Sequence, residues 1–230
     1  MGMTEKQEIF DFMGGCVRFV RGHYNPTCDA VWLAAFVPCG AKSVLDVGIG
    51  TGGVSMCIGW RYPKIKITGI DISDDMLNEC AVNAELNHIS ISLVKHDILT
   101  WKTDVVFDIV VSNPPYFKGN PAKHNAHHNV DLRQWTQACM RRVKPRGWFC
   151  TIVDAAQTAS VLSEMANKCG DIGVLPLFSN KNTAERVLLR GRIGTKGGTT
   201  LFGGININAT QILRDGLTID EYLATLKPQC

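Results

Sequence analysis

The sequence contains no apolar run of the eighteen or so residues that a membrane-spanning helix needs, and its N-terminus lacks a basic segment followed by an apolar stretch. Internal repeats, low-complexity tracts and Pro/Ser-rich linkers are also missing. These absences predict a cytoplasmic chain without a membrane partner. Its 230 residues, 45% hydrophobic and 20% charged, are typical of one folded domain and not of a disordered chain.

Cysteine is frequent, but its pattern suggests neither disulfides nor metal. The nine Cys residues are an odd number, with no C-x-x-C pair and no Cys/His cluster at the spacing of metal ligands. The sequence therefore predicts reduced, mostly buried thiols and no bound metal.

The net charge of +3 conceals an asymmetry along the chain. Residues 1–117 carry 9 Lys and Arg against 13 Asp and Glu, whereas residues 118–199 carry 13 against 5. A basic block on a nearly neutral protein is typical of a nucleic-acid footprint, although solvated side chains on helix faces give the same count. Both interpretations stay open at this point.

From residue 42 onward, short β-branched runs alternate with longer amphipathic stretches. Strands are expected at 43–47, 64–70, 89–94, 105–111 and 148–153, and helices at 53–60, 74–86 and 132–143. Ser73 is placed to cap the second helix and Lys144-Pro145 to close the third. Strands separated by helices predict parallel βαβ units in a doubly wound sheet, which binds ligands at the carboxyl ends of its strands.

A glycine loop follows the first strand. Gly48, Gly50 and Gly53 form a G-x-G-x-x-G pattern, which indicates a nucleotide-like ligand. Asp46 precedes the loop; its carboxylate would repel a pyrophosphate but suits the sulfonium and ammonium of S-adenosylmethionine. The sequence therefore predicts S-adenosylmethionine as the cofactor, held by Asp46, Gly48 and Gly50. In the alternative, Asp46 only caps the loop backbone.

Two more acids follow strands at the same edge of the predicted sheet, the rim where the carboxyl ends of the parallel strands meet. Asp71, 21 residues after Gly50, is predicted to accept the ribose hydroxyls, and Ile72 is expected to contact the cofactor beside it. Asp97 is predicted to accept from the adenine amino group, with Ile98 packing on the ring. The structural alternatives are a helix cap for Asp71 and a solvated loop acid for Asp97.

The segment Asn113-Pro114-Pro115-Tyr116 follows the fourth strand, and its two prolines restrict the backbone. An exocyclic amine on a flat base is a poor nucleophile because its lone pair is delocalised. If the Asn113 side-chain oxygen and the Pro114 carbonyl accept its N–H bonds, the lone pair turns toward the methyl donor, while Tyr116 stacks on the base. Asn113, Pro114, Pro115 and Tyr116 are the predicted catalytic set, and a plain Asn-Pro turn is the alternative.

The order and spacing of these motifs carry a resemblance. Asp-Val-Gly-Ile-Gly-Thr-Gly, Gly-Ile-Asp, His-Asp-Ile and Asn-Pro-Pro-Tyr-Phe are similar to the motifs of the class I S-adenosylmethionine-dependent N-methyltransferases. Within them, the chain resembles the tRNA adenine N6-methyltransferase family that acts next to the anticodon of valine tRNA. Further matches are residues 25–34, Phe117, Trp135 and residues 184–189.

The resemblance implies an α/β fold, the Rossmann-like class I methyltransferase with a seven-stranded doubly wound sheet. It also implies that Thr27 and Asp29 help to close the cofactor site, and that Asn113 contacts cofactor as well as target amine. The expected organisation is an N-terminal lead and helix packing on the cofactor site (1–40), the methyltransferase domain (41–195) and a C-terminal extension of that domain (196–230).

RNA, and within RNA a tRNA, is the predicted partner. Arg186, Arg190 and Arg192 alternate along a late strand and are expected to form a basic strip beside the active-site mouth. Phosphate contact and a solvated loop are both compatible with the basic stretch 118–130, whose cationic and imidazole side chains are Lys118, Lys123, His124, His127 and His128. The tryptophans Trp32, Trp135 and Trp148 are expected in the core.

Other functions compete with methylation of adenine N6 in tRNA. A protein-glutamine N5-methyltransferase of release factors shares the Asn-Pro-Pro-Tyr segment, because a carboxamide poses the same lone-pair problem. Only about 40 residues precede the first strand, which is short for the N-terminal domain usual in that family. An N2-guanine rRNA methyltransferase is a further alternative. Asp46 argues against a dinucleotide oxidoreductase, and the complete motif set argues against an inactive RNA-binding module.

Overall fold

The computed structural model describes residues 8–22, 24–114, 131–179 and 182–226. The strands of its main sheet are β3 (Ser43–Val47), β4 (Lys66–Asp71), β5 (Ile91–Lys95), β6 (Phe107–Ser112), β7 (Val143–Asp154), β8 (Cys169–Phe178), β9 (Arg186–Ile193), β10 (Thr199–Leu201) and β11 (Ile205–Asn206). The helices are α1 (Cys28–Phe36), α2 (Gly53–Arg61), α3 (Asp74–Leu86), α4 (Leu132–Met140), α5 (Thr158–Ala166), α6 (Thr210–Leu213) and α7 (Ile219–Thr225), with short 3-10 turns at Met13–Gly15 and Ala155–Gln157.

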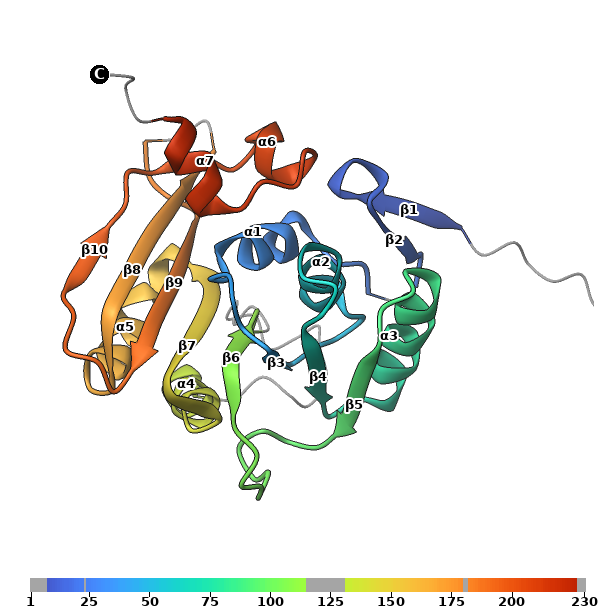
Figure 1. Ribbon diagram of the computed structural model, residues 1–230, viewed down its shortest axis with the longest axis horizontal. Coiled ribbons are helices and arrows are strands. Elements are labelled where there is room, and N and C mark those ends of the chain that lie inside the picture. Colours follow the sequence, from blue (N-terminus) through green and yellow to red (C-terminus); the bar gives the residue numbers. More distant parts are fainter. Residues whose placement is uncertain (1–7, 23, 115–130, 180–181, 227–230) are drawn as a thin grey trace, which may run out of the picture.

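The main sheet has the order β10-β8-β9-β7-β6-β3-β4-β5, and β11 also pairs with β8 (Figure 1). β3 pairs in parallel with β4 on one side and with β6 on the other, so the strand order reverses at β3. β9 runs antiparallel to its neighbours β7 and β8. The seven-stranded doubly wound sheet is confirmed as β8-β9-β7-β6-β3-β4-β5, and the short strands β10 and β11 extend it along β8.

Alternating residues of each central strand divide the apolar interior into two layers. Val44 and Ile109 face the cluster that contains α1, α2 and α3, whereas Leu45 and Val110 face the cluster that contains α4 and α5. Both faces of the sheet are therefore covered, and only the ends of its strands remain to present a site.

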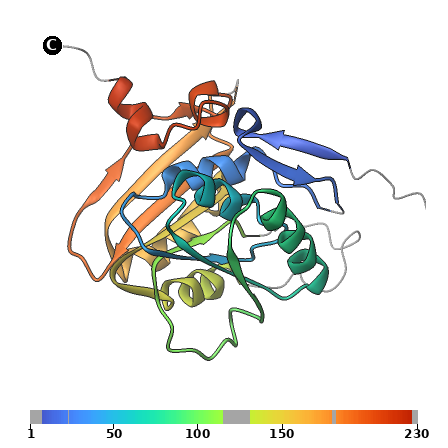
Figure 2. The ribbon, with the colours of Figure 1, turned by 45° about the vertical axis from the view of Figure 1, so that its right-hand side comes forward.

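Two peripheral units extend the α1 side of the molecule. A hairpin of β1 (Ile9–Phe12) and β2 (Val17–Val20) packs beside α3, where the Asn83 side-chain oxygen accepts from the backbone N–H of Val20 at 3.0 Å. The C-terminal helices lie over α1 (Figure 2), and Trp32 donates from its indole to the Ile207 carbonyl at 3.0 Å. The Thr218 side chain and Glu221 form a capping box that starts α7.

The largest change to the predicted boundaries is at the junction of α4 and β7. The helix predicted over 132–143 ends at Met140, because β7 already begins at Val143, opposite Phe107 of β6. Lys144-Pro145 therefore lies within the strand and closes no helix. Ser73 caps α3 as predicted, since its hydroxyl accepts from the Met76 N–H at 3.4 Å.

The cysteine and tryptophan side chains can be compared with their predicted burial. All eight cysteines in the described ranges are free, and five of them are buried. Trp32 is fully buried, while Trp135 and Trp148 are half-buried. Within the described residues, no helix is both long and apolar enough to cross a membrane, and no three His, Cys, Asp or Glu side chains gather as metal ligands.

Candidate active site

The glycine loop between β3 and α2 depends on left-handed backbone. Gly48, Gly50 and Gly52 have φ angles of +71°, +52° and +90°. The N–H groups of Gly48 and Ile49 donate to the Ile70 carbonyl of β4, at 2.9 and 3.1 Å. A Cβ added at Gly50 would meet nothing within 4 Å. The loop is thus anchored on the sheet while its backbone at Gly50 stays open to a ligand.

Asp46 lies under this loop and is almost completely buried, with 1% of its surface exposed. Its Oδ2 atom accepts from the Ser55 hydroxyl at 2.7 Å, in the first turn of α2. Burial raises the pKa of the Asp46 carboxyl to about 7, the nearby Asp71 adds to the increase, and the hydrogen bonds from Ser55 oppose it. The capping alternative therefore describes what Asp46 contacts here, and its contact with the cofactor stays a prediction.

Asp71 ends β4 and is held by backbone amides on both oxygens. Oδ2 accepts from the Gly50 N–H at 2.9 Å, and Oδ1 accepts from the Ser73 N–H at 3.0 Å. This carboxylate ties the glycine loop to the second strand of the rim. Because Ser73 caps α3, the helix-cap alternative for Asp71 is wrong; its ribose contact, with the exposed Ile72 beside it, stays a prediction.

Asp97 and Ile98 lie in the turn that follows β5, two residues beyond the end of the strand. Asp97 is half-buried, and its Oδ1 atom accepts from the Leu99 N–H at 2.9 Å. Ile98 is buried in the cluster that contains α4. The adenine contact predicted for both residues is not tested by these internal contacts.

Asn113 follows β6 at the point where the sheet order reverses. Its Oδ1 atom is buried and has no hydrogen-bond partner among the described residues. The preceding Ser112 is fixed on three sides: its hydroxyl donates to the Val47 carbonyl at 3.0 Å and accepts from the Trp135 indole at 2.9 Å, and its carbonyl accepts from the Thr151 hydroxyl at 2.8 Å. The rim thus holds an unsatisfied acceptor on a rigid support.

The described ranges stop within the catalytic segment. Asn113 and Pro114 are described, whereas Pro115, Tyr116 and the basic stretch 118–130 lie outside the described residues. The predicted roles of Pro115 and Tyr116 accordingly stay predictions.

Trp135 of α4, which was expected in the core, is also a neighbour of the glycine loop. A Cβ added at Gly48 would lie 3.3 Å from its Cζ2 atom, so the indole covers one side of the glycine loop. The same ring packs against the apolar cluster of α4 and bonds Ser112. Nothing in the local sequence pattern links Trp135 to a loop 87 positions earlier, although the family resemblance included it.

The start of α1 packs against the same loop. A Cβ added at Gly53 would lie 2.7 Å from Pro26 and 3.1 Å from Ala30. Thr27 is exposed at the N-cap, and Asp29 is buried with its Oδ2 atom 3.1 Å from the Arg186 Nε atom. Burial raises the pKa of Asp29, and Arg186 opposes the shift. The structure brings this segment to the loop, while the cofactor contacts of Thr27 and Asp29 stay predictions.

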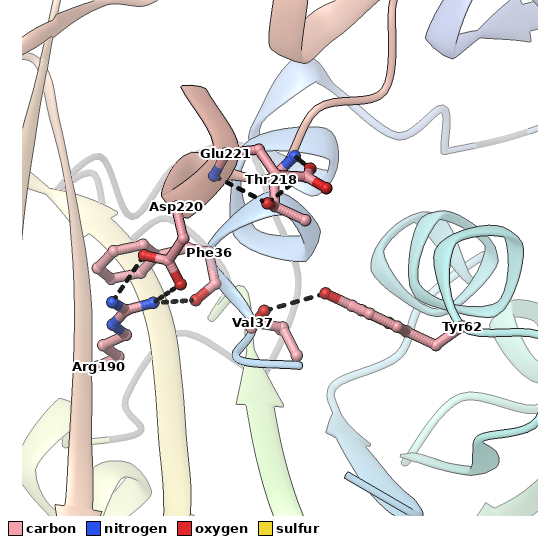
Figure 3. Close-up of polar contacts among 7 residues, drawn as sticks. All are labelled: Phe36, Val37, Tyr62, Arg190, Thr218, Asp220 and Glu221. Atoms are coloured by element: carbon pink, nitrogen blue, oxygen red, sulfur yellow. Dashed lines mark hydrogen bonds and ion pairs between the residues drawn. The ribbon is translucent and has the colours of Figure 1, made fainter. Parts of the chain in front are cut away.

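The prediction of a basic strip beside the active-site mouth is wrong. Arg192 pairs with Trp148 at the amino-terminal part of β7, at the edge of the sheet away from the glycine loop, and the other two arginines form internal contacts. Arg186 also pairs with Asp154, and Arg190 bonds Asp220 of α7 at 3.0 Å and the Phe36 carbonyl at 3.3 Å (Figure 3). The Arg190 guanidinium also lies 4.5 Å from the centre of the Phe36 ring. These two cations are used in internal contacts because α1 and α7 cover the face of β9 on which they lie.

Solved structures of methyltransferases share this fold. A protein of Agrobacterium tumefaciens described as a predicted O-methyltransferase has a TM-score of 0.65 and 19% identity, over 78% of this chain and 88% of that one. The N-methyltransferase NodS of Bradyrhizobium japonicum, solved with S-adenosylhomocysteine, has a TM-score of 0.52 and 15% identity, over 73% and 84%. With the glycine loop where the strand order reverses, the fold is that of the class I S-adenosylmethionine-dependent methyltransferases.

Curated relatives include two methylation activities. The tRNA1(Val) (adenine(37)-N6)-methyltransferase of a Flavobacteriaceae bacterium is 30% identical over 170 residues, 70% of this chain and 73% of that protein. The protein of the same name from Glaesserella parasuis is 32% identical over 44% of this chain and 45% of that protein. The release factor glutamine methyltransferase of Aliivibrio fischeri is 38% identical over 35% of this chain and 29% of that protein. The chain spans less than half of the latter two relatives.

Residues 29–173 match the Methyltransferase small domain family, and the chain belongs to it. It is a class I S-adenosylmethionine-dependent N-methyltransferase, an enzyme whose cofactor is S-adenosylmethionine. The open backbone at Gly50 and the unsatisfied Asn113 acceptor fit a ligand at this rim. The cofactor supplies an electrophilic methyl group on its sulfonium.

Proposed function

We propose that this enzyme methylates the exocyclic N6 amino group of adenine in tRNA. The observation that carries the proposal is the buried Oδ1 atom of Asn113, which has no partner among the described residues. An acceptor left unsatisfied in a protein interior costs about 1–3 kcal/mol, and an N–H group of the substrate removes that cost.

A planar amine needs such an acceptor to react. Its lone pair is delocalised into the ring, and hydrogen bonds to Asn113 and to the Pro114 carbonyl turn the nitrogen toward pyramidal geometry. The nitrogen then forms a bond to the methyl carbon as the carbon–sulfur bond breaks, and its extra proton leaves to solvent. The rigid support of Asn113 by Ser112 keeps the acceptor in place during transfer.

Two further observations favour adenine in tRNA over the other amino targets. The match to the tRNA-modifying relative of the Flavobacteriaceae bacterium covers 70% of this chain, whereas the match to the glutamine-modifying relative of A. fischeri covers 35%. The excess of 13 Lys and Arg over 5 Asp and Glu in residues 118–199 favours a polyanionic substrate. A base reaches Asn113 only from a single-stranded loop or after flipping.

Glutamine of a release factor is the second candidate. It rests on the 38% identity with the A. fischeri relative and on the chemistry of Asn113, because a carboxamide nitrogen has the same delocalised lone pair. Guanine N2 in rRNA poses the same chemical problem, but none of the relatives described above acts on it.

Nucleoside mass spectrometry separates these targets. Unmodified tRNA is incubated with the protein and labelled S-adenosylmethionine, and a peptide containing Gly-Gly-Gln is incubated in parallel. We expect label in N6-methyladenosine and none in the peptide. Label in the peptide alone, or in N2-methylguanosine of added rRNA alone, would contradict the proposal.

A further inference from the structure

A surface groove of about 490 Å³ lies at the amino-terminal edge of the sheet, away from the glycine loop. It is lined by residues 38–42 between α1 and β3, by Asp108 and Ile109 of β6, and by residues 144–148 of β7. Along β6, Asp108 and Asn113 are separated by roughly 16 Å at the usual rise of a strand. The groove is therefore distinct from the catalytic rim but on the same strand.

The wall formed by β7 is a bulge. Phe107 pairs with Val143 and Ile109 pairs with Trp148, so residues 144–147 oppose the single residue Asp108. Arg146 within the bulge has a φ of +64°, a conformation that costs energy for a side chain of this size. Bulges change the direction in which side chains point, and strained backbone of this kind is concentrated at functional sites.

Among the described residues that line the groove, Asp108 is the one carboxylate, and both of its oxygens accept hydrogen bonds. Its Oδ2 atom accepts from the N–H groups of Lys42 and Ser43 at 2.9 and 3.0 Å, and its Oδ1 atom accepts from Lys144 Nζ at 2.8 Å. The hydrogen bond from Lys144 is the main reason that the pKa of Asp108 falls to about 2. Asp108 thus stays an anion, neutralised by its own neighbours.

The remaining cations of the groove stay available. Lys42 and Arg146 are exposed, and neither forms an ion pair with another described residue. Arg192 donates to the Arg146 carbonyl at 2.8 Å, and its guanidinium lies 5.8 Å from the ring centre of Trp148 in the groove wall. Cations beside an aromatic ring are the composition of a surface that binds a nucleic-acid backbone.

We propose that this groove binds phosphates of the RNA substrate at a distance from the methylated base. The inference rests on the proposed function for the identity of the RNA. Lys42 and Arg146 supply the contacts to phosphate, while the Asp108 network keeps the bulge in place. Phosphate contacts of this kind hold and orient a substrate without reading its sequence.

The test is tRNA binding by the double variant Lys42→Gln/Arg146→Asn. Asn adopts positive φ readily, so the second change keeps the backbone of the bulge. Binding to unmodified tRNA is measured by fluorescence anisotropy from 50 to 200 mM salt, and S-adenosylhomocysteine binding by calorimetry. We expect the slope of log affinity against log salt to fall by about one unit for each cation removed, and tRNA affinity to fall about tenfold at 0.1 M salt. S-adenosylhomocysteine affinity should be unchanged.

The matched control is Arg214→Gln, which removes an exposed arginine at the end of α6, outside the groove lining. It should leave the salt slope within half a unit of the original. An unchanged slope in the double variant, equal losses in the control, or no tRNA binding by the unaltered protein would each overturn the groove assignment. Methylation of the tRNA by the unaltered protein is scored separately, so loss of the proposed function is recognised independently of the groove.

Discussion

At the scale of single residues, the acids at the strand ends already accept hydrogen bonds from residues that the structure describes, whereas the Asn113 side-chain oxygen does not. Asp46, Asp71 and Asp97 each accept from a hydroxyl or backbone N–H group of the chain. Asn113 Oδ1, in contrast, is buried without a partner in the described part of the chain. Asp71 and Asp46 therefore support the glycine loop and the start of α2, and Asn113 Oδ1 is the acceptor that we propose for the substrate amine.

Replacing Asn113 tests that division. Asn113→Ala removes the acceptor for the amine, so we expect the methyl-transfer rate constant to fall by about 10² to 10³, with S-adenosylhomocysteine affinity changed by less than a few fold. Asn113→Asp keeps an oxygen at the same place and should retain more activity than the Ala variant. The rate is measured in single-turnover assays and the affinity by calorimetry. Loss of cofactor affinity equal to the loss of rate would show that Asn113 acts on the cofactor instead.

Asp46 predicts a pH dependence with a defined sign. Its pKa is about 7 in the folded protein, against about 3.9 for an unperturbed Asp. The folded state therefore holds this proton more tightly, and the contribution of Asp46 to stability, complete below pH 4, is lost as the pH rises to 7. A cationic ligand favours the ionised carboxylate, so S-adenosylmethionine affinity should rise with pH, on the order of tenfold between pH 5.5 and 7.5.

The measurement is calorimetric titration with S-adenosylmethionine across that range, where its ammonium stays largely protonated. Asp46→Asn is the matched variant, because it keeps the shape of the side chain and cannot ionise. We expect weaker binding at pH 7.5 and a nearly flat profile in this variant. An identical pH profile in both proteins would assign the titration to another group.

At the scale of elements, α1 is held at both ends. Its first turn is bonded to β9 through Asp29 and Arg186, and its last carbonyls accept from Arg190 and from the Tyr62 hydroxyl, the latter at 3.3 Å to Val37 (Figure 3). The helix start also packs against Gly53 at the end of the glycine loop. The C-terminal segment that binds Arg190 therefore helps to position a helix that borders the site.

Arg190 is accordingly expected to contribute stability. Its side chain is 14% exposed, whereas that of its partner Asp220 is 58% exposed. Arg190→Ala removes bonds to Phe36 and Asp220 and the stacking on Phe36, so we expect the free energy of unfolding to fall by about 1–3 kcal/mol. Asp220→Asn removes only the exposed partner and should cost under about 1 kcal/mol. Urea denaturation of both variants tests this, and equal small losses would show that the arginine adds no more than a surface pair.

At the scale of the whole molecule, the basic stretch of the chain does not become one basic surface. Arg186 pairs with Asp29 and Asp154, and Arg190 pairs with Asp220 of α7. Arg146 and Arg192 instead lie at the edge of the sheet opposite the glycine loop, together with Lys42 from an earlier segment. The sequence predicted a polyanionic partner at a basic strip beside the active-site mouth, and that location is wrong because folding pairs Arg186 and Arg190 with acids far away in the chain.

The order of strands and helices between residues 43 and 153, the glycine loop and the acids at the strand ends could be predicted from the sequence alone. They follow from local features: apolar periodicity, turn residues and the rule that parallel strands end on one edge. The end of α4 was predicted wrongly because the pairing of Val143 with Phe107 outweighs the helical preference of its own segment. A distant partner of that kind leaves no mark on the local pattern.

Only the tertiary structure decided which side chains are available. Asp29 meets Arg186 across 157 positions, Trp135 meets the glycine loop, and residues 144–147 bulge out opposite Asp108. Each contact depends on strand order and on the helices packed above it, so no spacing in the chain encodes it. The sequence by itself determined which reactive residue types and motifs this protein has. Packing determined which of its charged and polar side chains are bonded internally and which remain available to a ligand.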